Sequence, residues 1–305
     1  METISAIPIF VAIAEHQGFS AAARELGITK SAVSKRISQL EAQLGVRLLH
    51  RSTRKLSLTE AGERYYEYAK LAAKATQDAE DAVSELQGEP RGLLKILGPM
   101  SFGQLHISPL IPHFLERYPQ VQVDLVLDDR PLNLIEEGFD LAIRAGVLPD
   151  SRLIARRLAS LRSVVCCSPK YYERHQEQLK TPSNLEHHNC LFYSYSDNAE
   201  VWSFENKNAP REKHVVKVHG NFRVNNSEAL KTAMVGGLGV GRLPTFVAGQ
   251  SIRNGELVQL FPEYAMPTRD LSIVYPERNF LPEKVRVFSE FTQNQFGKDV
   301  PYWEI

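Results

Sequence analysis

Residues 21–41, AAARELGITKSAVSKRISQLE, combine two helical patterns with a single break between them. Gly27 is suited to end the first helix, and Thr29 is suited to cap the second. The alanines at 21–23 allow the first helix to pack closely against a neighbour. Apolar residues recur along the second helix at spacings of four, three and four, which places them on one side: Val33, Ile37, Leu40 and Leu44. The stretch predicts two short helices joined by a tight turn.

The other side of the second helix carries small polar and cationic side chains. Ser31, Lys35 and Ser38 lie roughly opposite the apolar stripe, and Ser34 lies on its flank. Such side chains can enter a DNA major groove and reach base edges and phosphates. The alternative is a helical hairpin in a protein core, with this side facing water.

Residues 46–62, VRLLHRSTRKLSLTEAG, favour DNA binding over that alternative. They are typical of two strands joined by a basic turn, the wing of a winged helix-turn-helix. The formal charge of the chain is zero, with 36 basic and 36 acidic residues. From residue 29 to residue 55, however, seven basic residues accompany one acid, Glu41. A local concentration of positive charge is expected where a protein meets DNA.

Residues 19–62, FSAAARELGITKSAVSKRISQLEAQLGVRLLHRSTRKLSLTEAG, closely resemble the N-terminal domain of LysR-type transcriptional regulators. Three later stretches, FDLAIRAG, ASLRSVVCCSPKYY and MVGGLGVGRLP, resemble the ligand-sensing region of that family, so the resemblance covers essentially the whole chain. The chain departs from the commonest pattern at Lys30, often Gln in the family, and at Lys35, often Arg. The operator sequence therefore cannot be carried over.

The resemblance implies an α+β multidomain fold. We expect a winged helix-turn-helix at 1–58, a linker and dimerisation helix at 59–88, and an effector-binding domain of periplasmic-binding-protein type at 89–305. Its implied partners are promoter DNA, a second copy of the chain in a homodimer or dimer of dimers, a small effector, and RNA polymerase. We expect DNA contacts from Ser20, Thr29, Lys30, Ser31, Ser34, Lys35, Arg36, Ser38, Arg51, Thr53 and Arg54.

A second helical pattern follows the basic turn, with small and apolar residues alternating at spacings of four and three. The members of this seam are Tyr65, Ala69, Ala72, Thr76, Ala79, Val83 and Leu86. That spacing is typical of a left-handed coiled coil, and the small residues favour close approach of two helices. The seam predicts dimerisation; packing of the helix on its own domain is the alternative.

After the breaker-rich sequence GEPRG at 88–92, strand-like and helical runs alternate. The alternation predicts βαβ units and a mainly parallel sheet, with a helix before Gly138. We expect lobe I at about 93–161 and 269–305, and lobe II at about 162–268. Ligands in such folds bind beyond the carboxyl ends of strands, near helix N-termini.

Polar residues at these strand ends, together with the family resemblance, predict the effector site: Met100, Ser101, Phe102, Asp128, Arg144, Gly146, Asn225 and Asn226. A helix N-terminus at Ser101 and a guanidinium at Arg144 favour a small carboxylate. Asp128 and Asp129 would oppose an anion if they faced the cavity. The alternative roles are helix capping for Ser101 and Ser227, and pairing with a carboxylate for Arg144.

Several patterns argue against an enzyme, a metal site or a cofactor. GGLGVG at 236–241 lacks the G-x-G-x-x-G spacing and follows a helix, the reverse of the dinucleotide-binding order. The histidines show no metal-ligand spacing, and no G-x-S-x-G elbow occurs. An α/β enzyme with an accessory DNA-binding domain remains the alternative, and a purely architectural DNA binder is a further one.

No run approaches the ~20 apolar residues of a membrane span, and the first residues lack the pattern of a signal peptide. We therefore expect a cytoplasmic protein. Three cysteines fit a reducing compartment. Cys166 and Cys167 are typical of core strand residues, and a redox switch with Cys190 is an alternative role.

Overall fold

The computed structural model describes residues 2–51, 56–85, 89–146, 153–196, 198–277, 281–296 and 301–304. The chain forms two compact units: residues 1–90 with 133–138 make the N-terminal unit, and residues 91–132 with 139–305 make the C-terminal unit. No helix among these described residues is both long enough and apolar enough to cross a membrane.

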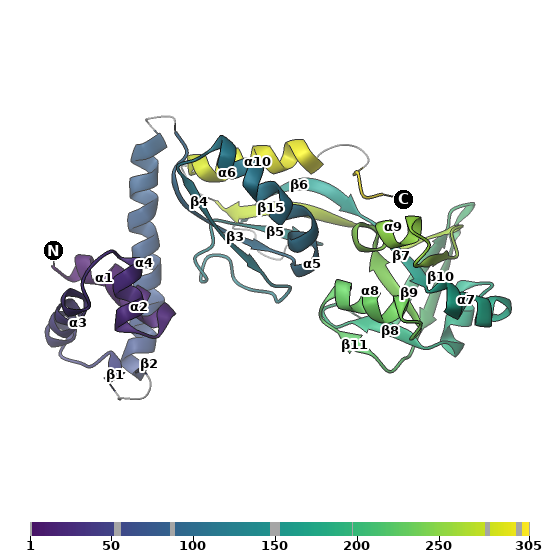
Figure 1. Ribbon diagram of the computed structural model, residues 1–305, viewed down its shortest axis with the longest axis horizontal. Coiled ribbons are helices and arrows are strands. Elements are labelled where there is room, and N and C mark those ends of the chain that lie inside the picture. The colour runs from purple at the N-terminus through teal and green to yellow at the C-terminus, as the bar shows by residue number, and fades with distance from the viewer. Residues whose placement is uncertain are drawn as a thin grey trace. The chain divides into compact units, whose positions relative to one another are not determined.

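The N-terminal unit combines helices with a short antiparallel hairpin (Figure 1). Its elements are α1 (Glu2–His16), α2 (Phe19–Glu25), α3 (Lys30–Leu44), β1 (Leu49–Arg51), β2 (Leu56–Leu58) and α4 (Glu60–Glu85). Gly27 and Gly45 adopt the left-handed conformation next to the ends of α2 and α3. Thr29 Oγ1 accepts a hydrogen bond from the Ala32 amide at 3.2 Å and so caps α3.

The apolar stripe of α3 is buried in the core of this unit, where Val33, Ile37 and Leu40 pack with residues of α1 and α2. Leu44, the last member of the stripe, is exposed at the end of the helix. Glu41 is buried as well, and its Oε1 accepts hydrogen bonds from the backbone amides of Leu48 and Leu49 at 2.9 and 3.2 Å. This carboxylate therefore attaches α3 to the strand that begins the hairpin.

Two residues of the predicted dimer seam, Tyr65 and Ala69, lie in the core of this unit instead. The ring of Tyr65 meets that of Phe10 edge-on at 5.2 Å, and Ala69 is buried. The same helical spacing that suits a coiled coil also suits packing on α1, so sequence spacing did not separate the two. Of the other seam residues, Ala72 is half-buried, Thr76 is exposed, the side chains of Ala79 and Val83 are not described, and Leu86 lies outside the described residues.

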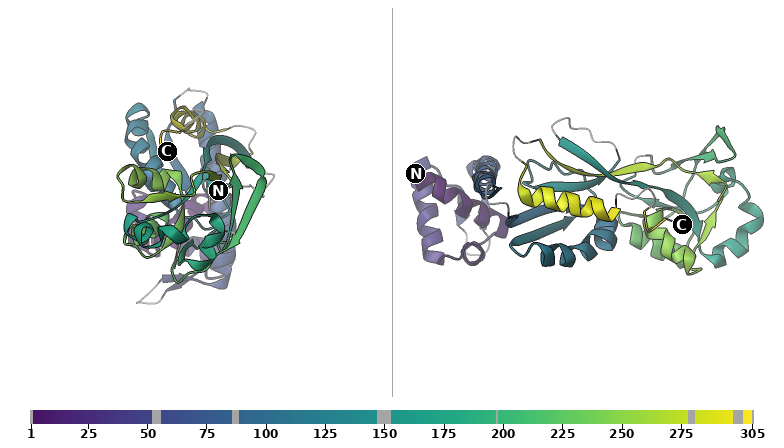
Figure 2. Two further views of the ribbon diagram at one scale, coloured as in Figure 1. Left: turned by 90° about the vertical axis from the view of Figure 1, so that its right-hand side faces the viewer. Right: turned by 90° about the horizontal axis from the view of Figure 1, so that it is seen from above.

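In the C-terminal unit, lobe I is built on a five-stranded sheet with the order β4-β3-β5-β15-β6. Figure 2 shows α10 lying along one face of this sheet. The strands are β3 (Gly92–Gly98), β4 (Val121–Leu127), β5 (Leu141–Ala145), β6 (Leu153–Leu161) and β15 (Arg269–Pro276). The helices are α5 (Met100–Phe102), a π-helical turn (Gly103–Ile107), a 3-10 turn (Ser108–Leu110), α6 (Ile111–Arg117) and α10 (Glu283–Phe296).

Lobe II contains a second five-stranded sheet, with the order β11-β8-β12-β7-β13, and a three-stranded sheet, β10-β9-β14, that was not expected. The strands are β7 (Ser163–Cys167), β8 (Cys190–Tyr193), β9 (Val201–Asn206), β10 (Ala209–Lys217), β11 (Arg223–Val224), β12 (Val240–Pro244), β13 (Val258–Leu260) and β14 (Tyr264–Ala265). The helices are α7 (Pro169–His175), α8 (Ser227–Val235) and α9 (Thr245–Arg253), with 3-10 turns at Gln176–Gln178 and Pro182–His187.

The prediction of mainly parallel sheets is wrong. In lobe I, β3 pairs in parallel with β4 and β5, but β15 is antiparallel to both β5 and β6. In lobe II, β8 is parallel to β11 and β12, whereas β7 is antiparallel to β12 and β13. The chain passes directly from β6 into β7 of the other lobe and returns as β15, and these crossing strands run against their neighbours.

The helix expected before Gly138 is also absent, and residues 134–138 form turns. The side chain of Asn133 accepts a hydrogen bond from the Ile135 amide at 3.1 Å, and Gly138 adopts a left-handed conformation. An Asx-type hydrogen bond of this kind competes with helix formation, because it offers the backbone another partner.

A buried ion pair connects α10 to the lobe I sheet. Lys284 and Asp140 are each 2% exposed, and Lys284 Nζ lies 3.9 Å from Asp140 Oδ2. Lys284 Nζ also donates to the Leu93 carbonyl at 2.6 Å, while Asp140 Oδ2 accepts from the Lys95 amide at 2.9 Å. The additional hydrogen bonds are what a buried pair of charges requires.

Candidate functional site

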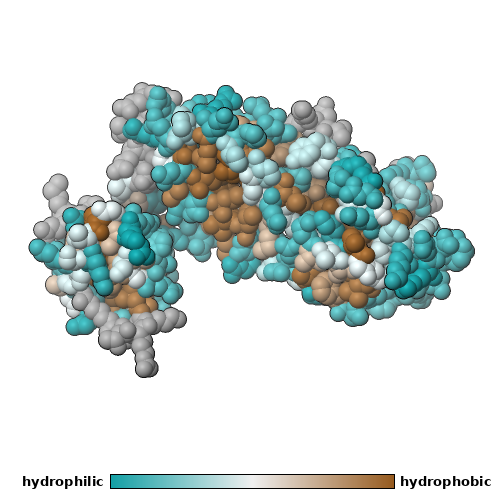
Figure 3. Space-filling model, viewed as in Figure 1, coloured by the Kyte–Doolittle hydropathy of each residue, from teal (hydrophilic) through white to brown (hydrophobic). Residues whose placement is uncertain are grey.

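The outer side of α3 presents hydroxyl and cationic groups to the surroundings of the N-terminal unit. Of the residues predicted to contact DNA, Ser34 is half-buried and the following are exposed: Ser20, Thr29, Lys30, Ser31, Lys35, Arg36 and Ser38. The visible surface of this unit is mainly hydrophilic (Figure 3). The arrangement can donate hydrogen bonds to base edges and place positive charge near phosphates. The side chain of Arg51, together with Thr53 and Arg54, lies outside the described residues.

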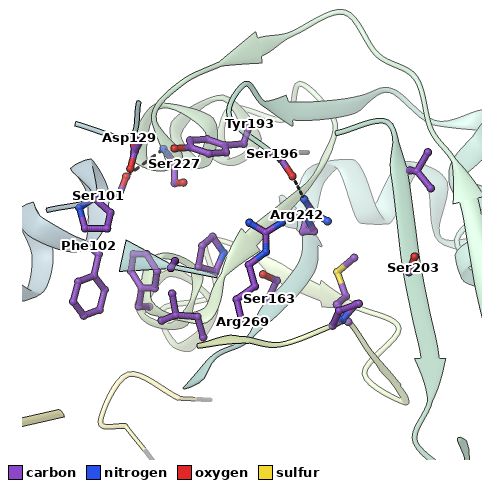
Figure 4. A pocket seen from close by; sticks show the side chains of 18 residues that line it. Ser101, Phe102, Asp129, Ser163, Tyr193, Ser196, Ser203, Ser227, Arg242 and Arg269 are labelled. Carbon is purple, nitrogen blue, oxygen red and sulfur yellow. Dashed lines mark hydrogen bonds between the residues drawn. The ribbon is translucent and has the colours of Figure 1, made fainter. Parts of the chain in front are cut away.

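A cavity of about 250 Å³, which we call the first cavity, lies between the two lobes of the C-terminal unit (Figure 4). Lobe I contributes Ser101 and Phe102 of α5, and lobe II contributes Tyr193, Ser227, Arg242 and Phe246. Side chains from β8, β12 and the starts of α8 and α9 meet here because these strand and helix ends lie at one edge of the lobe II sheet. The cavity thus combines aromatic walls with hydroxyl and guanidinium donors.

Two arginine side chains reach into the centre of this cavity in Figure 4, Arg242 from β12 and Arg269 from the start of β15. An Arg242 guanidinium nitrogen donates to Ser196 Oγ at 2.5 Å. Burial lowers the pKa of Arg242, and the charge of Arg269 lowers it further. Two like charges near each other in a partly buried site favour an anion between them, because an anion relieves both the desolvation and the repulsion.

Two acids lie at the same edge of lobe I, and each has hydrogen-bond partners of its own. Asp128 pairs with Arg130 at 2.5 Å, and hydrogen bonds from Arg130 lower the pKa of Asp128. Asp129 lines the cavity, accepts a hydrogen bond from the Met100 amide at 3.1 Å and interacts with the Tyr193 hydroxyl. Burial raises the pKa of Asp129 in spite of these hydrogen bonds.

The comparisons with known proteins cover both units. The sequence model described as bacterial regulatory helix-turn-helix protein, lysR family, matches residues 4–63, and that of the LysR substrate binding domain matches residues 87–297. The chain belongs to the LysR family of transcriptional regulators. It is a DNA-binding regulator with an effector-binding domain, and it is not an enzyme. The family resemblance and the fold class inferred from the sequence are therefore confirmed.

Relatives of this LysR-type regulator match it over nearly their whole length. An uncharacterized HTH-type transcriptional regulator of Haemophilus influenzae is 35% identical over 93% of this chain and 98% of the relative. The regulator PtxR of Pseudomonas aeruginosa is 34% identical, over 95% of this chain and 92% of its own. The solved structure of CrgA, a LysR-type regulator of Neisseria meningitidis, is 31% identical, with a TM-score of 0.62 over 96% of this chain and 99% of CrgA.

In this LysR-type regulator, four of the eight predicted effector residues line cavities. Ser101 and Phe102 line the first cavity. Asp128 and Arg144 line a second cavity of about 610 Å³, which shares Asp129, Tyr193 and Arg269 with the first. The guanidinium of Arg144 donates a short hydrogen bond to the Leu132 carbonyl oxygen, so it holds a loop of its own lobe.

The other four predicted effector residues line neither cavity. Asn226 caps α8, accepting from the Ala229 amide at 2.9 Å, and Asn225 is exposed. Asn226 Nδ2 also lies 2.9 Å from the sulfur of Met100, a contact between the lobes. The Gly146 amide donates to the Asp270 carbonyl at 2.8 Å and continues the sheet. Helix capping thus accounts for Asn226, and backbone pairing accounts for Gly146.

Sequence reasoning missed Arg242 and Arg269. Arg242 stands in the otherwise apolar run VGRLP, and a charge inside a buried strand was the available signal. Arg269 gave no such signal, because it begins β15 at an exposed position.

The three cysteines are buried, and no metal-binding cluster occurs in the described part of the chain. Burial raises the pKa of Cys167 and of Cys190 to about 12, and also raises that of Cys166. Cys167 and Cys190 belong to β7 and β8, which are separated by β12. Buried thiols of high pKa are poor nucleophiles, so the geometry does not favour the redox switch.

Proposed function

We propose that this LysR-type regulator reads promoter DNA with the outer side of α3 and responds to a small carboxylate held by Arg242 and Arg269. The observation that carries the effector class is the half-buried guanidinium of Arg242 beside the Arg269 charge in the first cavity. A forked guanidinium matches a carboxylate with two hydrogen bonds. Phe102 and Phe246 on the cavity wall suit an aromatic or apolar body.

A thermal-shift comparison of benzoate with benzamide tests the effector class. The two probes have the same ring, but only benzoate carries a negative charge. A ligand that binds the folded state alone raises the melting temperature with concentration. Stabilisation by benzoate and not by benzamide supports the proposal, whereas equal shifts or none across a panel of small carboxylates would contradict it.

We expect Lys35→Ala to weaken operator binding without unfolding the N-terminal unit. Lys35 is exposed on α3 opposite the buried stripe, so its loss leaves the core intact. Losing one base or phosphate contact costs about 1–3 kcal/mol. Fluorescence anisotropy with a duplex recovered by in vitro selection, at several salt concentrations, measures the change.

Lys170→Ala is the control for this variant, because it removes an exposed lysine from α7 in lobe II. It should bind the duplex like the unmodified protein. If Lys35→Ala also binds like the unmodified protein at every salt concentration, α3 does not present Lys35 to DNA.

We further propose that the chain dimerises through the exposed apolar side of α4. Tyr68 and Leu71 are 73% and 45% exposed, and Ala75 lies on the same side of the helix. Large apolar side chains left in water on one helix face favour a partner helix. Two copies would present two α3 helices to DNA, as in other dimeric helix-turn-helix proteins. Contact with RNA polymerase and a cytoplasmic location remain predictions.

Leu71→Glu should dissociate this dimer, because symmetry would bring the new charges together in an apolar contact. Sedimentation velocity should show a smaller species, and operator affinity should fall because one half-site binds weakly alone. Leu71→Met is the matched control and should sediment as the unmodified protein does. A Leu71→Glu protein of unchanged size would place the dimer contact elsewhere.

A further inference from the structure

The short segment of residues 301–304, which we call the strap, follows α10 and contacts both lobes of the C-terminal unit. Trp303 is 3% exposed, and its ring meets those of Phe102 and Phe296 in lobe I at 5.4 and 5.6 Å. Glu304 reaches lobe II, where its Oε1 accepts a hydrogen bond from Thr245 Oγ1 at 3.0 Å. The strap therefore bridges the lobes beside the first cavity.

The strap contacts one aromatic wall of the cavity, Phe102, and the residue that precedes the other wall, Thr245 before Phe246. Phe102 lines the cavity from α5, and Phe246 lines it from the first turn of α9. The two rings meet edge-on at 5.1 Å, and Phe246 packs against the cores of both lobes. Any change in the spacing of the lobes must alter this contact. Trp303 also contacts the Phe102 ring, and so it helps to hold this wall of the cavity in place.

The Glu304 carboxylate lies at the start of α9, where its charge is favourable. Its side chain is only 7% exposed, and its Oε2 lies 3.9 Å from Nη1 of Arg162, a residue on the crossing between β6 and β7. Thr245 is the first residue of α9, whose preceding residue, Pro244, provides no side-chain cap. The positive end of the helix dipole favours a carboxylate here. Glu304 thereby fixes both the crossing segment and the helix turn that carries Phe246.

His106 in lobe I contacts two residues of the strap, Tyr302 and Trp303. It lies in the π-helical turn after α5, with its ring 4.8 Å from that of Trp303 and its Nδ1 2.5 Å from the Tyr302 hydroxyl. Burial lowers its pKa to about 4, so the imidazole is neutral near neutral pH. π-helical turns within helices often occur at functional sites.

We propose that Trp303 and Glu304 are positioning residues of the effector cavity. They hold Phe102 and the first turn of α9 at a fixed separation. This separation determines the affinity of the cavity for an aromatic carboxylate. It also couples ligand binding in one lobe to the position of the other lobe. The inference rests on the proposed effector site. It concerns residues that line neither cavity and that the sequence did not single out.

Two matched pairs of variants test the strap in the full-length protein. Trp303→Ala removes the whole indole, whereas Trp303→Phe retains one aromatic ring and loses the second ring, together with an indole N–H that has no partner among the described residues. Glu304→Gln removes the charge at α9, and Glu290→Gln removes an exposed charge on α10 as its control. Hydrogen exchange of the amides at 102–103 and 245–247 reports the positions of the two walls without any ligand.

We expect exchange at both places to accelerate about tenfold in Trp303→Ala, and at 245–247 in Glu304→Gln. Calorimetry should show benzoate binding about 3- to 10-fold more weakly in these two variants. Trp303→Phe should show smaller changes than Trp303→Ala, because it keeps one ring in place. Glu290→Gln should keep the exchange rates and affinity of the unmodified protein. The melting temperature of Glu304→Gln should change little, which separates positioning from general stability.

Unchanged exchange and unchanged benzoate affinity in Trp303→Ala and Glu304→Gln would overturn the proposal. Accelerated exchange across the whole C-terminal unit would overturn it too, because the strap would then be a stabiliser only. If benzoate fails to bind the unmodified protein, the proposed effector class fails, and the exchange at 102–103 and 245–247 still decides the role of the strap.

Discussion

Asp140→Ala is expected to lower the free energy of unfolding of the C-terminal unit by about 3–5 kcal/mol, because it removes the carboxylate that lies beside the buried Lys284 amine. The substitution also removes the acceptor of the Lys95 amide. Urea denaturation followed by circular dichroism measures the loss as a shift of the midpoint. The exposed Asp124→Ala in β4 is the control and should change the midpoint little.

The double variant Asp140→Leu with Lys284→Met separates the pair from the remaining packing. Replacing both charges by apolar side chains removes the uncompensated charge, so much of the lost stability should return. A double variant as unstable as Asp140→Ala would show that the hydrogen bonds to Leu93 and Lys95 matter more than the charges.

Arg242→Ala is expected to weaken benzoate binding by about 30-fold or more. A buried charge pair loses about 2–5 kcal/mol when one partner is truncated, and every 1.4 kcal/mol is tenfold in affinity. Arg242 is the more buried of the two arginines, since Arg269 is exposed. Arg269→Ala should therefore have the smaller effect. Isothermal titration calorimetry measures both.

Arg242→Lys is the informative control, because lysine keeps the charge and loses the planar fork. Its affinity should lie between those of the unmodified protein and Arg242→Ala. If Arg242→Ala binds benzoate as tightly as the unmodified protein while remaining folded, Arg242 does not hold the anion.

The helix-turn-helix could be predicted from sequence because local rules determine it. Val33, Ile37 and Leu40 share one side of α3 by helical spacing alone, and all three are buried. Thr29 and Gly27 mark the helix ends through chemistry that involves only near neighbours. For α4, the spacing of apolar residues could not distinguish a dimer seam from packing within the N-terminal unit. Tyr65 and Ala69 suit packing on α1 as well as they suit a coiled coil.

The sheets and the cavity depended on contacts between distant segments. The antiparallel pairing of β15 with β5 and β6 joins residues far apart in the sequence, and no local pattern specifies it. Ser101 and Phe102 were found because a strand followed by a helix start marks a cavity edge in this fold class. Arg242 and Arg269 come from separate strands and meet only in the folded protein.

The most direct measurement is the affinity of the full chain for a duplex selected from random DNA, with and without benzoate. We expect selection to recover one recurring sequence, and we expect benzoate to change the affinity of the unmodified protein for that sequence. In Arg242→Ala the affinity without benzoate should be the same, and benzoate should no longer change it. Failure to recover any recurring sequence would contradict sequence-specific DNA binding. An equal response to benzoate in both proteins would contradict effector binding by Arg242.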